Sequence, residues 1–120
     1  MQEVIEKSFG VISQQAEAMA EYLEDKEGRL PRSYVKEKDE IVTSDSKWWC
    51  SGFFPGVLWY LYEYSGDPVH RKLAEDFSAR VEKEKYNTYD HDIGFQIYCS
   101  FGNGYRLTGR EDYRDVLKVA

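Results

Sequence analysis

The chain has 120 residues, of which 42% are hydrophobic and 16% aromatic, so it can build the core of at most one small domain. Its formal net charge of −6 argues against a nucleic-acid partner or an anionic membrane surface, because both need a basic patch. It contains no apolar run long enough for a transmembrane helix and no visible signal peptide, which predicts a cytoplasmic or periplasmic location.

The first predicted element is an amphipathic helix in the first 23 residues. Its apolar residues recur at alternating steps of four and three and form one stripe: Ile5, Phe9, Ile12, Ala16, Met19 and Leu23. The helix should end near Gly28, which can adopt the left-handed cap conformation. Residues 29–47 are polar, include Pro31 and show no clean period, so we predict a long loop or irregular turns that serve a function or cover a surface.

A helical hairpin is predicted to follow this loop. Residues 51–64 are apolar almost all round, which is typical of a buried helix, and Gly66 closes it. Asp67 and Pro68 then open an amphipathic helix as its N-cap and first-turn proline. The charged run 82–85 that follows is predicted to face solvent.

A second hairpin is predicted in the last thirty residues. Residues 92–107 are again mostly apolar, although the alternation of Ile93, Phe95 and Ile97 would also suit a strand. We interpret the stretch as a helix because its counterpart at 51–64 has a clear helical length. Thr108 and Glu111 have the spacing of a capping box that opens a last helix.

The two hairpins repeat with a period of 43 residues. Three residues of the first recur in the second at this spacing: Tyr62, Gly66 and Arg71 match Tyr105, Gly109 and Arg114. A helical hairpin repeated at this length is the signature of stacked α/α units, of which about three or more are needed for stability. We therefore predict an all-α fold in which residues 1–120 form the N-terminal portion of a larger α/α toroid or solenoid, with the remainder of the toroid barrel or solenoid expected downstream. A free-standing five-helix domain is the alternative.

The candidate site residues precede the two buried helices. Trp48 and Trp49 stand before the first, and His91 and Asp92 stand before the second. Helices two apart in an antiparallel array run in the same direction, so these residues should meet at one rim. An aromatic wall that faces a carboxylate suits a sugar ring, because aromatic faces bind sugar C–H surfaces and carboxylates bind hydroxyls. Taken singly, each residue also has a structural explanation as a core tryptophan, an N-cap or a hydrogen-bonding histidine.

No cofactor or metal is expected from the sequence. It has no glycine-rich phosphate loop, no metal-ligand cluster and no plausible Ser-His-Asp set. The two cysteines, Cys50 and Cys99, lie in apolar surroundings and are predicted to be buried free thiols.

Two strings, WWCSGFFPGVLWYLYEYSGD at 48–67 and HDIGFQIYCSFGNGYRLTG at 91–109, resemble glycoside hydrolase family 88, the unsaturated glucuronyl hydrolases. The resemblance runs from about Leu30 to the end of the chain. It implies an (α/α)6 barrel that acts on oligosaccharides made by polysaccharide lyases, whose non-reducing end is a 4,5-unsaturated uronic acid. It also implies hydration of the vinyl ether: a proton goes to C4 and water to C5, and the resulting hemiketal opens and releases the rest of the sugar.

The same resemblance assigns roles to three residues. Asp92 falls on the first of the family's two catalytic aspartates and would contact the sugar near the double bond. Trp49 would pack on the unsaturated ring, and His91 would neighbour the bound uronate. The second aspartate, which is the general acid and base, and most groups that hold the uronate carboxylate are expected past Ala120, so residues 1–120 alone are expected to be inactive.

Two other functions stay open at this point. The related unsaturated rhamnogalacturonyl hydrolases share the fold and the chemistry on pectin fragments. A non-catalytic α/α scaffold that binds proteins or peptides would instead carry variable exposed residues at the rim, rather than tryptophans and a His-Asp pair.

Overall fold

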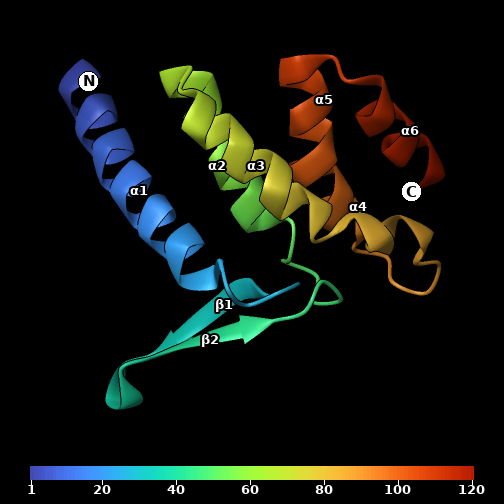
Figure 1. Ribbon diagram of the computed structural model, residues 1–120, viewed down its shortest axis with the longest axis horizontal. Helices are drawn as coiled ribbons and strands as arrows, with labels where there is room; N and C mark the ends of the chain where they lie inside the picture. Colours follow the sequence, from blue (N-terminus) through green and yellow to red (C-terminus); the bar gives the residue numbers. More distant parts are fainter.

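The computed structural model describes residues 1–120, which form a helical body with a β-hairpin at one end (Figure 1). The helices are α1 Gln2–Leu23, α2 Phe53–Ser65, α3 Pro68–Ala79, α4 Ile93–Ile97, α5 Asn103–Thr108 and α6 Glu111–Val119. Shorter turns are the 3-10 segments η1 Lys36–Lys38 and η2 Glu82–Tyr86 and the π-helical segment η3 Tyr98–Gly102, and the strands are β1 Leu30–Val35 and β2 Glu40–Ser44. None of the helices has the length and apolar character that crossing a bilayer requires.

The predicted repeat of helical hairpins is confirmed by the way the two hairpins turn. Gly66 after α2 and Gly109 after α5 both adopt the left-handed conformation, with φ of 67° and 70°. Each donates its N–H to the equivalent tyrosine carbonyl, at 2.7 Å for Tyr62 and 2.8 Å for Tyr105. The hairpin of α2 and α3 therefore has the same turn as the hairpin of α4–α5 and α6, and the two stand side by side.

An ion pair joins equivalent positions of the two repeats. Arg106 on α5 donates two hydrogen bonds of 2.8 Å to the carboxylate of Glu63 on α2, and the two residues are 43 positions apart. Both side chains are nearly half exposed, so solvent screens the pair and its contribution to stability is small. The pair is nevertheless a direct contact between equivalent positions of the two hairpins.

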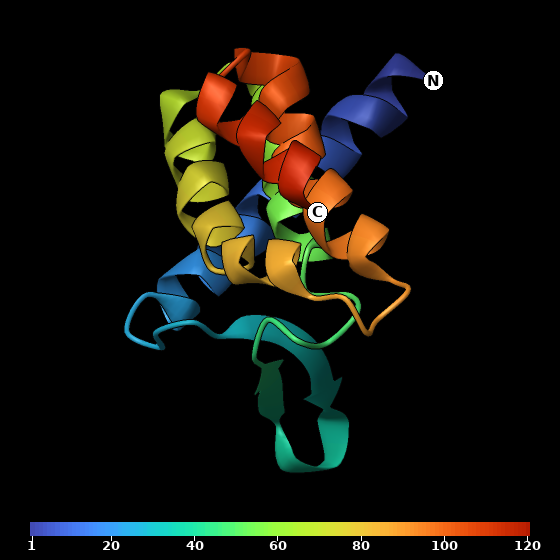
Figure 2. The same ribbon diagram turned by 90° about the vertical axis from the view of Figure 1, so that its right-hand side faces the viewer.

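The prediction of a long loop at 29–47 is wrong. The segment contains an antiparallel β-hairpin that projects from the helical body (Figure 2), with Asp39 in the left-handed conformation at its tip. Its register begins with Leu30 opposite Ser44 and contains an irregularity between Pro31 and Ser33. Leu30 and Ser44 at its base are buried, and along the rest of the strands buried and exposed residues do not alternate, so the sequence pattern could not reveal them.

The apolar stretch predicted at 92–107 is helical, and the strand alternative is wrong, but the helix is not regular. It runs as α4, the π-helical turn η3 and α5. The Ser100 hydroxyl lies 2.6 Å from the carbonyl oxygen of Gln96 and 3.2 Å from that of Ile97, where it competes with the backbone ladder. π-Helical turns inside α-helices are frequent at functional sites.

The two predicted helix starts have different outcomes. The side chain of Asp67 accepts a 2.9 Å hydrogen bond from the Val69 N–H at the start of α3, with Pro68 at the first position, as predicted. The capping box at Thr108 and Glu111 is wrong, because Thr108 is the last residue of α5 and Arg110 is the N-cap of α6. The Thr108 hydroxyl instead donates to the carbonyl of Gly104 at 2.7 Å.

The first helix ends earlier than predicted because another helix caps it. α1 stops at Leu23, and Gly28, in the left-handed conformation predicted for it, lies in the turn beyond. The guanidinium of Arg80 at the end of α3 donates to three carbonyl oxygens there: Leu23 at 3.1 Å, Lys26 at 2.9 Å and Arg29 at 2.8 Å. The Leu23 and Lys26 carbonyls also accept backbone N–H groups of the turn that follows the helix, and Arg80 adds a charged donor to each of the three.

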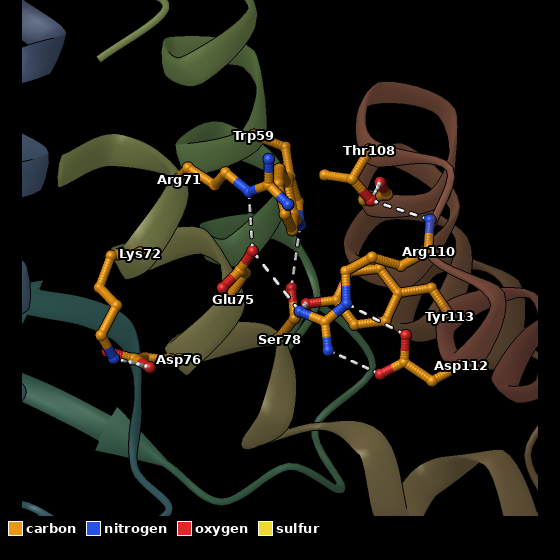
Figure 3. A network of polar contacts seen from close by, with 11 residues as sticks. Trp59, Arg71, Lys72, Glu75, Asp76, Ser78, Thr108, Arg110, Asp112 and Tyr113 are labelled. Carbon is orange, nitrogen blue, oxygen red and sulfur yellow. Dashed lines mark hydrogen bonds and ion pairs between the residues drawn. The ribbon is translucent and has the colours of Figure 1, made fainter. Parts of the chain in front are cut away.

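A polar network ties the two hairpins together next to the core (Figure 3). Trp59 of α2 is fully buried, and its indole N–H donates to Ser78 at 3.0 Å. The ring of Tyr113 on α6 packs edge-on against Trp59, at a centroid distance of 6.1 Å. Burial raises the pKa of Tyr113 to about 12, so its phenol stays neutral. The guanidinium of Arg110 lies over this ring and pairs with Asp112 and Glu75.

Candidate functional site

Three aromatic rings form a cluster where the two buried helices begin. The rings of Trp49, Phe53 and Phe95 pack edge-to-face in every pairing, at centroid distances of 5.9, 5.7 and 5.9 Å. They come from the segment before α2, from the first turn of α2 and from α4. Each ring is 40–46% exposed, so the cluster presents aromatic surface to solvent. Edge-to-face packing holds the rings in place and leaves faces for a ligand.

The segments before α2 and α4 lie at the same end of the helices, on the side of the β-hairpin (Figure 1). Trp49 contacts Phe95, which lies three residues after Asp92. Burial raises the pKa of the thiol of Cys50, the residue after Trp49, and the negative charge of Asp92 raises it further. The predicted convergence of Trp49 and Asp92 at one rim agrees with this geometry.

Gln96 connects the two segments from within. Its side chain is fully buried, and its amide nitrogen lies 2.8, 3.2 and 3.1 Å from the carbonyl oxygens of Ser46, Lys47 and Trp48. Those three carbonyls belong to the chain just before Trp49. The helix that follows Asp92 therefore fixes the position of the loop that carries the tryptophan.

A second set of buried polar contacts supports the same loop. Ser51 donates to the Ser46 carbonyl at 2.7 Å, and the Ser46 hydroxyl donates to Glu84 at 2.6 Å. All three side chains are buried. The prediction that the charged run 82–85 faces solvent is therefore wrong at Glu84, whose carboxylate is turned inward by a hydroxyl partner that the sequence pattern does not reveal.

Gly52 allows the two helices to approach each other closely. A methyl group at this position would lie 2.6 Å from the carbonyl oxygen of Phe95 and would collide with that of Gln96. One turn later, a methyl group at Gly56 would lie 3.0 Å from the carbonyl oxygen of Cys99. These two glycines let the backbone of α2 lie against α4 and η3, which brings the aromatic cluster together.

The carboxylate of Asp92 is available to a ligand. It makes no capping hydrogen bond to α4, although Asp92 is the N-cap residue, and its side chain is 28% exposed. Its nearest titratable neighbours are His91, with Nε2 at 3.8 Å from Oδ2, and Asp90, with a carboxylate oxygen within 4.8 Å. The backbone N–H of Asp92 is held by Asp90 at 2.9 Å, so the loop is fixed while the carboxylate stays free.

The other two predicted site residues are placed differently. The ring of His91 is 94% exposed and has only the long contact to Asp92. Trp48 is half-buried, and the guanidinium of Arg32 lies over its ring at 5.1 Å from the centroid. Trp49 is therefore the more exposed of the two tryptophans, and its role and that of Asp92 in binding stay predictions.

Neither cysteine is suited to act as a nucleophile. Both are free and half-buried, so the predicted free thiols are confirmed but are not fully buried. Burial raises the pKa of Cys99, and burial together with the negative charge of Asp92 raises that of Cys50, so both thiols stay protonated at neutral pH.

Three residues that could ligate a metal ion lie close together in the same loop. Ligand atoms of Asp90, His91 and Asp92 all lie within 4.8 Å of one another. Exposed acidic groups commonly gather in this way without a metal. The expectation that the site needs no metal stays a prediction.

Several residues of the site were missed in the sequence. Gln96 and Glu84 act through buried hydrogen bonds between segments that are far apart in the chain, and Arg32 lies in a hairpin that we expected to be a loop. The one available signal was at Gln96, a polar residue between Phe95 and Ile97 in an apolar stretch. A buried polar residue of this kind has to find partners.

Comparison with known proteins gives consistent matches over most of the chain. It is 38% identical over 89 residues to an unsaturated glucuronyl hydrolase from Formosa agariphila, which covers 73% of this chain and 22% of that protein. It is 34% identical over 108 residues to an unsaturated chondroitin disaccharide hydrolase from Streptococcus pyogenes serotype M1, which covers 79% of this chain and 27% of that protein. No family model matches the chain.

A solved structure supports the same relationship. The crystal structure of an unsaturated glucuronyl hydrolase specific for heparin superimposes on 99% of this chain with a TM-score of 0.87 and 33% identity. The match covers 31% of that protein. The helical hairpins described above therefore form part of an α/α toroid, and the chain spans about a fifth to a third of the length of the proteins that it matches.

Proposed function

The chain belongs to the unsaturated glucuronyl hydrolases, glycoside hydrolase family 88, and from this membership we propose that the natural protein containing it releases 4,5-unsaturated uronic acid from the non-reducing end of lyase-generated oligosaccharides. The observation that carries the proposal is the meeting of an aromatic cluster and a free carboxylate at one end of the buried helices. Such a site offers a stacking surface and a hydroxyl acceptor to one sugar ring.

The reaction is a hydration. Water supplies a proton to C4 and a hydroxyl to C5 of the vinyl ether, so the double bond is consumed and C5 becomes a hemiketal. The hemiketal opens, and C1 is left as a hemiacetal that releases the rest of the oligosaccharide. No electron donor or acceptor is needed, because water accounts for every atom that is added.

In this scheme the residues of the chain bind and orient the sugar. Trp49 packs on the unsaturated ring, and the edge-on contacts of Phe53 and Phe95 hold the tryptophan in position. Asp92 accepts a hydrogen bond from a sugar hydroxyl or from the attacking water near the double bond, since its carboxylate has no strong partner in the protein. His91 neighbours the bound uronate. A second aspartate outside residues 1–120 provides the general acid and base in this scheme.

We also propose that residues 1–120 are the N-terminal portion of an (α/α)6 barrel. One face of α2 supports this, because Phe53, Val57 and Tyr60 recur at steps of four and three and are 39–53% exposed. Tyr98 on η3 is likewise 56% exposed. An inner helix of a toroid would place such a face against further helices of the barrel.

The experiment is a direct assay of the natural protein. Unsaturated disaccharides from heparin, chondroitin and a rhamnogalacturonan lyase digest are supplied separately, and loss of ultraviolet absorbance reports consumption of the C4=C5 double bond. Turnover of at least one glucuronyl substrate is expected, with release of the neighbouring sugar. Absence of turnover on every uronyl substrate would overturn the proposal.

The same panel tests the alternatives. An unsaturated rhamnogalacturonyl hydrolase would consume only the pectin-derived disaccharide, whereas the names of the matched proteins favour glucuronyl substrates. A non-catalytic scaffold would consume none, and the half-exposed tryptophan beside a free carboxylate argues against it.

A further inference from the structure

The β-hairpin brings a cation to the candidate site. Arg32 lies on β1, in the part of the hairpin next to the helical body. In the strand register Pro31 faces Thr43 and Ser33 faces Val42, so Arg32 is the residue without an opposite partner. Such an irregularity re-aims a side chain and is common next to active sites. The guanidinium lies over the ring of Trp48, the neighbour of Trp49.

Arg32 is also the one arginine whose guanidinium is not already engaged. The chain has seven arginines, and the other six all donate hydrogen bonds to protein oxygens: Arg29, Arg71, Arg80, Arg106, Arg110 and Arg114. Arg32 forms no hydrogen bond or ion pair and is exposed, so the five N–H donors of its guanidinium remain free. Its stacking on Trp48 limits the orientations of this group before any ligand arrives.

Arg32 lies next to the loop that carries Trp49. The guanidinium lies 5.1 Å from the centroid of the Trp48 ring, on the loop that continues into Trp49 and Cys50. Burial raises the pKa of the Cys50 thiol, the negative charge of Asp92 raises it further and the positive charge of Arg32 lowers it. An anionic sugar that binds beside Asp92 meets a like charge, and a cation on this loop reduces that repulsion.

We propose that Arg32 binds an acidic oxygen group of the oligosaccharide, a carboxylate or a sulfate, and so makes this rim selective for anionic sugars; the inference rests on the proposed function. The planar guanidinium fork matches two oxygens of either group. Arg32 acts in binding rather than in the chemical step, because it is held by an aromatic face and has no contact with a catalytic group.

The test compares Arg32→Gln, Arg32→Lys and Lys36→Gln in the natural protein. Lys36 is an exposed, unpaired cation in η1 at the far end of the same hairpin, so Lys36→Gln controls for loss of one positive charge. Arg32→Gln should raise KM for an acidic unsaturated disaccharide about tenfold, the loss of one charge-assisted contact, with kcat within about twofold. The KM of Arg32→Lys should lie between those of the wild type and Arg32→Gln. The KM of Lys36→Gln should stay within about twofold of the wild type.

Three substrates identify the acidic group. They are an unsulfated unsaturated disaccharide, its sulfated counterpart and the methyl ester of the uronate. If Arg32→Gln raises KM for both acidic substrates but not for the methyl ester, Arg32 binds the carboxylate. If it raises KM only for the sulfated substrate, Arg32 binds the sulfate. Equal KM changes for Arg32→Gln and Lys36→Gln on all three, or a fall in kcat alone, overturn the inference. Failure of the proposed function is distinct, because the wild-type protein would then leave the double bond intact.

Discussion

The side-chain amide of Gln96 lies 3.1 Å from the carbonyl oxygen of Trp48 and so connects the helix after Asp92 to the loop before Trp49. The same amide also lies 2.8 Å from the Ser46 carbonyl. Trp49 and Asp92 come from segments more than forty residues apart in the chain. Their relative position therefore depends on a buried contact that is not itself exposed to a ligand.

Replacement of this amide should loosen the loop. Gln96→Ala removes the donor to three backbone carbonyls and leaves them buried without it, so we expect about 2–3 kcal/mol lower free energy of unfolding. Denaturant unfolding measures the change, and Gln14→Ala on the exposed surface of α1 should cost less than about 0.5 kcal/mol. Equal effects of the two substitutions would mean that the loop is held by other contacts.

Two glycines at similar places offer a matched pair. Gly52→Ala puts a methyl group into the carbonyl oxygens of Phe95 and Gln96, whereas Gly94→Ala meets nothing within 4 Å. We expect Gly52→Ala to lower the free energy of unfolding by about 2–3 kcal/mol through overpacking. Gly94→Ala, inside α4, should be neutral or stabilising by up to about 1 kcal/mol. Thermal unfolding of both variants decides the matter.

The cap that Arg80 provides should be measurable in the same way. Arg80→Gln removes a charged donor from the carbonyls of Leu23, Lys26 and Arg29, and we expect a loss of about 2 kcal/mol. Arg114→Gln is the control, because its single 3.4 Å contact with Glu111 is exposed and should contribute little. Amide exchange should rise at the end of α1 in the first variant only; unchanged protection there would argue against the capping role.

The role proposed for Asp92 predicts a loss of turnover without a loss of fold. Asp92→Asn keeps the size of the side chain but removes the negative charge, so kcat on an unsaturated disaccharide should fall about 100-fold or more. The temperature of unfolding should stay unchanged, because the carboxylate makes no capping bond. Asp115→Asn, an exposed change of the same kind in α6, should keep normal turnover. Near-normal turnover of Asp92→Asn would remove this residue from the mechanism.

The features predicted correctly from the sequence are those that depend on nearby residues. The end of a helix at Gly66 and the N-cap at Asp67 depend on local backbone chemistry, and Gly109 repeats the position of Gly66. These positions could therefore be predicted from the sequence. The β-hairpin was missed because little packs against it, and without a buried face its residues need no alternation. Thr108 was misassigned because its hydroxyl had a second local partner, the Gly104 carbonyl.

The candidate site could be predicted only in outline. The repeat placed Trp49 and Asp92 at one end, since that required only the direction of two helices. The support given by Gln96 and the free guanidinium of Arg32 depend on which distant atoms end up nearby. Sequence periodicity has no information about such pairings.

The ion pair of Glu63 and Arg106 has a consequence for assembly. The two residues hold the same place in successive hairpins but carry opposite charges, so the pair forms between a first and a second hairpin and not between two copies of one. If two copies of the first hairpin met in place of a first and a second, Glu63 would face a carboxylate instead of a guanidinium. An exposed pair of this kind gives less than about 1 kcal/mol of stability, yet like charges in its place would oppose the wrong neighbour. The pair thus favours the observed neighbour of the first hairpin over a second copy of it.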